Sequence, residues 1–138
     1  MNPIQPRKNE KDESTKVGFV FDELSSRVIA AAVEVHRQLG PGFLESVYEQ
    51  ALGIELRKRG IPFESQKQVA VLYDGHKVGN HVLDVLVDGR LIVELKAVSG
   101  REDIHFAQVV SYLKATGARV GLLLNFNSPK LVIKRLVN

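Results

Sequence analysis

The hydrophobic residues of this chain change their spacing partway along, and this change restricts the folds open to it. As far as Gly60 they recur every three to four positions, which is typical of amphipathic helices with one buried side. From Gln66 onward they alternate, which is typical of strands with one buried face. Helical spacing returns over Glu102–Thr116 and is followed by two further apolar segments. This order of patterns predicts an α/β protein.

The same patterns predict where the individual elements lie. We expect helices over Phe21–Leu39, Phe43–Arg59 and Glu102–Thr116, and strands over Gln66–Tyr73, Val78–Val87, Leu91–Val98, Arg119–Asn125 and Leu131–Val137. Two Asp-Gly turns should join the first three strands as an antiparallel meander. The unbroken apolar run of the fourth strand indicates burial on both faces and a parallel neighbour, and the last strand is expected at an edge. The prediction is one mixed sheet flanked by helices.

Length and composition limit the class of protein further. The 138 residues suit one domain, which we place at residues 17–138. Residues 1–16 carry prolines and charges of both signs with almost no aliphatic side chains, so we expect a disordered N-terminal tail. The absence of cysteine excludes disulfides and thiolate chemistry. With no secretory signal and no apolar run of membrane-spanning length, we expect a cytoplasmic protein without a membrane partner.

Three charged residues interrupt the apolar pattern of the second and third strands. Asp84 lies in the second strand, and Glu94 and Lys96 lie two positions apart in the third. A charge on a half-buried strand costs folding free energy unless a partner or a metal ion compensates it. We expect these charges on one face and Leu83 with Val85 on the opposite, apolar face. Salt-bridged strand residues without a further role are the alternative interpretation.

The three charges meet only if the hairpin loop between these strands has an odd number of residues. A type I turn closed by a bulge at Gly89 is such a loop. It would place Leu86 opposite Arg90 and Asp84 opposite Ile92, one diagonal step from Glu94. Two converging carboxylates make an oxygen-rich site that suits Mg²⁺ or Mn²⁺.

The helices carry further polar residues in informative places. Glu45 falls in one row of the second helix with Gly42 and Tyr48, but periodicity alone favours a first-turn glutamate that complements the helix dipole. Gln108 and Tyr112 share a face of the third helix, where a surface or interface position is the alternative.

Together these segments resemble the PD-(D/E)xK nuclease superfamily, and within it the GxxExxY family. The resemblance covers roughly residues 24–137 and rests on four segments in order: Gly42-Phe-Leu-Glu45-Ser-Val-Tyr48, Asp84 with Glu94-Leu95-Lys96, Gln108-Val-Val-Ser-Tyr112, and GLLLNF at 121–126. Leu83 stands where the superfamily has a proline before the aspartate. The resemblance implies a restriction-endonuclease-like α-β-β-β-α-β core with an extra N-terminal helix.

The resemblance also implies a metal-dependent nuclease and the roles of its residues. Asp84, Glu94, the Leu95 carbonyl and Glu45 would hold Mg²⁺ or Mn²⁺, which activates water and neutralises charge on the scissile phosphate. Lys96 would position that water or stabilise the transition state. The nucleophile or the substrate phosphate would be supported by Gln108 and Tyr112.

The expected partner is nucleic acid, DNA rather than RNA, and the small domain suggests a homodimer or a targeting protein in addition. Two other functions stay open at this point. One is a catalytically weak module that binds nucleic acid or protein and retains the nuclease fold. The other is a structural α/β protein, which would leave Glu45 and Asp84 without a role. The net charge of +3 permits an anionic partner without indicating one.

Overall fold

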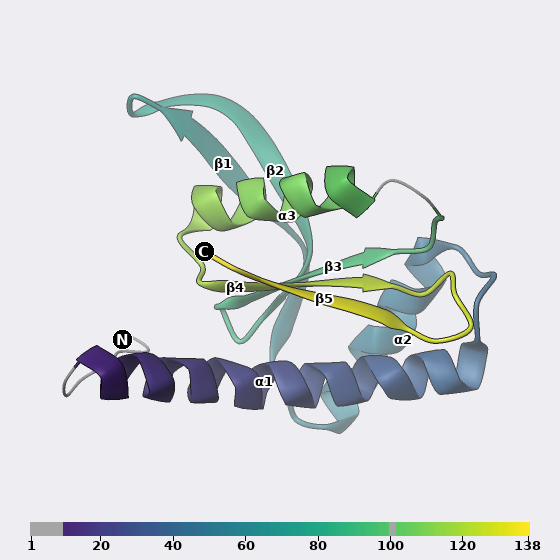
Figure 1. The fold of residues 1–138 in the computed structure, drawn as a ribbon. Helices are drawn as coiled ribbons and strands as arrows, with labels where there is room; N and C mark the ends of the chain where they lie inside the picture. The colour runs from purple at the N-terminus through teal and green to yellow at the C-terminus, as the bar shows by residue number, and fades with distance from the viewer. Residues whose placement is uncertain (1–9, 100–101) are drawn as a thin grey trace.

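The structure is a computed structural model that describes residues 10–99 and 102–138, with side chains from 23 to 99 and from 104 to 138. It contains a five-stranded mixed sheet with two helices on one face and one helix on the other (Figure 1). Its elements in chain order are α1 (Glu10–Leu39), α2 (Glu45–Lys58), β1 (Phe63–Tyr73), β2 (His76–Val87), β3 (Leu91–Lys96), α3 (Glu102–Thr116), β4 (Val120–Asn125) and β5 (Val132–Val137). This order confirms the predicted α/β fold.

The sheet follows the chain from one edge to the other, in the order β1-β2-β3-β4-β5. The first three strands form the predicted antiparallel meander. β3 and β4, joined through α3, pair in parallel as expected for the apolar run, and β5 pairs antiparallel at the edge. The mixed sheet and its flanking helices are therefore as predicted.

Helix α1 is longer than the periodicity indicated. It begins at Glu10 rather than at Phe21, so its first turns overlap the segment 1–16 that we predicted to be disordered. Residues 1–9 lie outside the described part of the chain, and the prediction for them stays a prediction.

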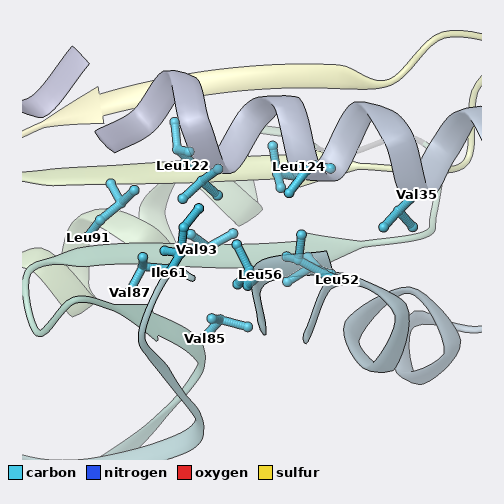
Figure 2. Packing of buried hydrophobic residues seen from close by; sticks show 14 of the residues in the cluster. Val35, Leu52, Leu56, Ile61, Val85, Val87, Leu91, Val93, Leu122 and Leu124 are labelled. Carbon is cyan, nitrogen blue, oxygen red and sulfur yellow. The ribbon is translucent and has the colours of Figure 1, made fainter. Parts of the chain in front are cut away.

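The hydrophobic core consists of two clusters, one on each face of the sheet. The larger cluster packs α1 and α2 against the sheet, and Figure 2 shows Leu52, Leu56, Val93, Leu122 and Leu124 meeting there. The smaller cluster lies under α3 and contains Leu83, Ile92, Val109, Tyr112, Leu113 and Leu123. Burial on both faces explains why the central strands read as nearly continuous apolar runs.

Close contact between α3 and β4 depends on a glycine. A Cβ atom added at Gly121 would lie 2.8 Å from Cγ1 of Val109 and 3.5 Å from Cδ2 of Leu113. Gly121 therefore lets the helix approach the strand more closely than any other residue type would allow.

The β2–β3 hairpin has the predicted odd number of loop residues but not the predicted register. Val87 pairs with Leu91, which leaves a three-residue loop, and Leu86 pairs with Ile92 instead of Arg90. The predicted type I turn is also wrong, because Asp88 has a φ of 52° and Gly89 a φ of 68°. Two successive positive φ angles match the right-handed twist of the flanking strands better than a type I turn does.

The β1–β2 pairing is irregular around Asp84. Ser65 pairs with Val85 and Lys67 with Leu83, but Gln66 between them has a φ of 53°. Leu83 packs under α3 whereas Val85 packs against the α1–α2 cluster, so the prediction that they share a face was wrong. The far half of the hairpin, where the register shifts between Val71 and Leu72, extends past α3, which contacts β1 (Figure 1).

Candidate active site

The predicted site lies where β2 separates from β3. The paired residues of the two strands end at Val85 and Val93, whereas β3 continues to Lys96. In place of backbone pairing, Oδ2 of Asp84 accepts a hydrogen bond of 2.9 Å from the backbone N–H of Leu95. The aspartate side chain thus satisfies a buried donor that the departing strand leaves without its ladder partner.

Glu94 is the most deeply buried charge of the site. Its residue is 3% exposed, and its carboxylate Oε2 lies 3.5 Å from Nζ of Lys96. The other carboxylate oxygen, Oε1, has no hydrogen-bond partner among the described residues. Asp84 and Glu94 are the neighbours in sequence of the last paired residues, Val85 and Val93, and the charge of Asp84 acts on Glu94. Two carboxylates and one ammonium group therefore share a largely dry space.

The electrostatics of this pair follow from burial. Loss of solvation, and next the negative charge of Asp84, raise the pKa of Glu94 to about 8, against the attraction of Lys96. Burial also raises the pKa of Asp84, although its hydrogen bond from Leu95 acts in the opposite direction. The buried pair therefore favours any cation that can replace its missing solvent.

Glu45 reaches the site from the first turn of α2. Its Oε2 accepts a hydrogen bond of 3.3 Å from the backbone N–H of Ala97, just beyond the end of β3. The charge of Glu45 also raises the pKa of Asp84. Glu45 therefore borders the carboxylate pair, and its hydrogen bond links α2 to the segment that follows Lys96.

The loop that delivers Glu45 is held by Tyr48. The phenol of Tyr48 donates to the carbonyl of Gly40 at 2.6 Å and accepts from the N–H of Phe43 at 3.1 Å. Its ring is fully buried and stacks on Phe126 at 4.4 Å. Tyr48 thus fixes the loop that precedes Glu45 through its bonds to Gly40 and Phe43.

Tyr112 faces the carboxylates from α3, and Gln108 bonds to Tyr112. Burial, then the charges of Glu94 and Asp84, raise the pKa of Tyr112 to about 12, and a hydrogen bond with Gln108 acts against this shift. Tyr112 therefore stays a neutral hydrogen-bond donor at physiological pH. The ring of His81, which we had not assigned to the site, packs edge-on against Tyr112 at 4.5 Å.

Two further residues of the site were missed by the sequence interpretation. Both carboxylate oxygens of Glu49 accept from Nε2 of Gln66, at 3.0 and 3.1 Å. Burial raises the pKa of Glu49, and the charges of Asp84 and Glu45 add to this shift. Glu49 follows Glu45 by four positions on α2, so helical spacing alone was a signal for it. The bond to Gln66 ties α2 to the distorted part of β1.

The residues present suit a divalent cation, although the described residues contain no group of three His, Cys, Asp or Glu side chains arranged to hold one. The unpartnered oxygen of Glu94 next to Asp84 offers hard, negatively charged donors of the kind that Mg²⁺ and Mn²⁺ prefer. In the present arrangement Glu45 is bound to Ala97 instead. The predicted role of the Leu95 carbonyl stays a prediction.

The fold and this cluster define the class of the protein. It has a restriction-endonuclease-like α/β architecture in which a carboxylate pair and a lysine lie where two strands separate. A model of the PD-(D/E)XK nuclease superfamily matches residues 22–136, and the chain therefore belongs to that superfamily.

Other comparisons add support for the fold alone. The structure described as the crystal structure of SSO0001 superimposes with a TM-score of 0.54 at 16% sequence identity, over 67% of this chain and 49% of that chain. This chain thus spans about half the length of that protein. No curated protein matches the chain. Among the described helices, none combines the length and apolar character needed to cross a bilayer.

Proposed function

We propose that the protein is a nuclease that hydrolyses phosphodiester bonds, with Mg²⁺ or Mn²⁺ as cofactor and DNA as substrate. The observation that carries the proposal is the buried Glu94, which has one unpartnered oxygen and lies beside Asp84 and Lys96. A buried acid of this kind is costly for stability and therefore indicates a functional site.

Asp84 and Glu94 are the residues that would hold the cation, with Glu45 as a further oxygen donor from α2. When bound, such an ion polarises the scissile phosphate and lowers the pKa of a water molecule. The role of the two acids is to fix the ion at the end of β3, and the N–H of Leu95 holds Asp84 in place for that task.

Lys96 acts on the reacting groups as a fixed positive charge. Its side chain is 15% exposed and lies beside Glu94, so its ammonium group can orient a water molecule or stabilise negative charge on the phosphate. Tyr112 and Gln108 supply neutral donors from α3. These groups bind and orient the water molecule and the phosphate. The low solvent exposure of the site strengthens each of these interactions.

A second function is favoured by one specific observation. Glu45 is engaged with Ala97, and no three-acid group is assembled among the described residues. A protein that binds nucleic acid but cleaves it weakly would fit this arrangement. The GxxExxY assignment, supported by the contacts of Tyr48, is proposed along with the nuclease function. The homodimer, the targeting partner and the cytoplasmic location stay predictions.

Cleavage assays separate the two functions. Single-stranded DNA, double-stranded DNA and RNA are incubated with the protein in Mg²⁺, Mn²⁺ or EDTA. The nuclease proposal predicts cation-dependent cleavage of DNA that Lys96→Ala reduces by about 10²-fold or more, while the thermal unfolding curve stays cooperative. Binding of DNA without cleavage in either metal would favour the weak module instead.

A further inference from the structure

A second group of basic side chains adjoins the candidate active site on the α3 side of the sheet. They line a small pocket that shares Lys96 with the carboxylate cluster. Its lining residues come from β3, α3, β4 and β5: Lys96, His105, Leu123, Asn125, Val132 and Lys134. No function assigned above uses Lys134 or His105.

Strand register explains how these residues come together. Glu94 pairs with Leu123, and Leu123 pairs with Lys134, so these three form one row across the sheet. Residues that pair directly project from the same face, and Leu123 belongs to the cluster under α3. Lys134 is therefore two strand spacings from Glu94, roughly 10 Å. The neighbouring row places Lys96 next to Asn125.

The pocket is lined by basic side chains. Among the residues whose side chains are described, two lysines and one histidine line it and no carboxylate does. Within the described part of the chain, neither Lys134 nor His105 makes an ion pair or a side-chain hydrogen bond. Asn125 is already occupied, since its Nδ2 donates to Val98 at 2.7 Å and its Oδ1 accepts from the N–H of Asn127 at 3.0 Å. Asn125 therefore shapes the wall of the pocket and leaves the lysines and the histidine as the ligand-binding groups.

The size of the pocket limits what enters it. Its inner volume is about 10 Å³, which is room for roughly one water molecule. A base or a sugar does not fit into such a space, but one oxygen of a phosphate group does. Lysine and histidine side chains bind phosphate oxygens through charge and hydrogen bonds, without reading sequence.

We propose that Lys134 and His105 form a phosphate-binding subsite for the nucleic-acid strand, next to the phosphate that is cleaved. The proposal rests on the proposed nuclease function and adds the path of the substrate. The strand crosses the ends of β3, β4 and β5, with its scissile phosphate at Asp84 and Glu94 and a flanking phosphate at Lys134. Recognition at this subsite is electrostatic and independent of sequence.

The test is the salt dependence of DNA binding. Affinity for a phosphorothioate oligonucleotide that resists hydrolysis is measured in Mg²⁺ at several salt concentrations, for the wild type and for Lys134→Ala. Loss of one phosphate contact weakens binding of all sequences alike and reduces the slope of log K against log[salt] by about 0.7 to 0.9. With cleavable DNA, the loss falls on KM more than on kcat. Lys134→Arg restores both, and His105→Ala weakens binding in the same direction.

Lys114→Ala is the matched control, because Lys114 is an exposed lysine in the last turn of α3 and has no part in the pocket. It removes the same charge and should leave the salt slope close to that of the wild type. If Lys134→Ala and Lys114→Ala behave alike while the wild type binds DNA, the subsite is overturned and the nuclease proposal stands. If the wild type neither binds nor cleaves nucleic acid, both proposals fall.

Discussion

The side chain of Asp84 accepts a hydrogen bond from the backbone of Leu95, at the point where β2 stops pairing with β3. This one contact joins the fold to the candidate chemistry. It holds the aspartate beside Glu94, and it satisfies the N–H that the separating strand would otherwise leave unpaired in the interior.

Glu94 should make the stability of the cation-free protein depend on pH. Its pKa is raised from 4.5 to about 8, so between these values the native state binds more protons than the unfolded state. The free energy of unfolding therefore falls as pH rises from 4.5 to 8. Glu94→Gln should remove this fall and stabilise the cation-free protein at pH 8, by at least about 1 kcal/mol.

Urea unfolding at a series of pH values in EDTA measures this effect. Glu23→Gln is the control, because Glu23 is exposed on α1. An unfolding free energy of Glu94→Gln that follows the same pH curve as the wild type would mean that Glu94 is not held protonated in the fold.

Asp84→Asn should separate cation binding from folding. Asparagine keeps an oxygen that accepts from Leu95 but loses the charge that attracts a cation. In the wild type, Mg²⁺ or Mn²⁺ at 100 times Kd should stabilise the native state by about 2.7 kcal/mol. Thermal melts should show a cation-dependent rise in Tm for the wild type and little or none for Asp84→Asn. An equal rise in both proteins would place the cation elsewhere.

The phenol of Tyr48 should matter for activity beyond its share of stability. Tyr48→Phe keeps the ring stacked on Phe126 but removes the bonds to Gly40 and Phe43. We expect a loss of about 1–2 kcal/mol in the unfolding free energy and a larger loss in kcat, because the loop that positions Glu45 loosens. Tyr73→Phe, at a site 75% exposed, should change neither. Full activity of Tyr48→Phe would show that Glu45 does not need this loop.

Gly121 should tolerate no side chain. Gly121→Ala brings a Cβ atom to 2.8 Å from Val109 and should push α3 away from β4, at a cost of about 1–3 kcal/mol. Because α3 carries Tyr112 and Gln108, nuclease activity should fall as well. Gly79→Ala is the matched control, since its nearest neighbour, Cβ of Val71, would lie at 3.8 Å. Urea unfolding measures the stability of both variants. Equal stability of Gly121→Ala and Gly79→Ala would contradict the close approach of α3 to β4.

Much of the fold could be predicted because hydrophobic period reports which face of an element is buried. The parallel pairing of β3 and β4, for example, follows from the apolar run over residues 120–124. The register of β2 against β3 could not be predicted as well, since it depends on the φ angle of Asp88. The irregularity at Gln66 was not visible either, because a polar residue in an alternating strand carries no sign of a positive φ.

The candidate site was predictable where a charge broke an apolar pattern, as at Asp84 and Glu94. It was not predictable where the role depends on contacts across the fold. Tyr48 was expected on the helix row of Glu45, but its hydrogen bonds to the preceding loop are a property of the folded chain. Glu49 shares the helix row of Glu45, but its bond to Gln66 depends on the distorted strand and is not visible in the spacing.

A crystal soaked in Mn²⁺ and measured at the manganese absorption edge tests the central claim most directly. We predict an anomalous peak roughly 2.0–2.3 Å from carboxylate oxygens of both Asp84 and Glu94, and its absence in crystals of Asp84→Asn. A Mn²⁺ ion bound away from both carboxylates in protein that cleaves DNA would contradict the account.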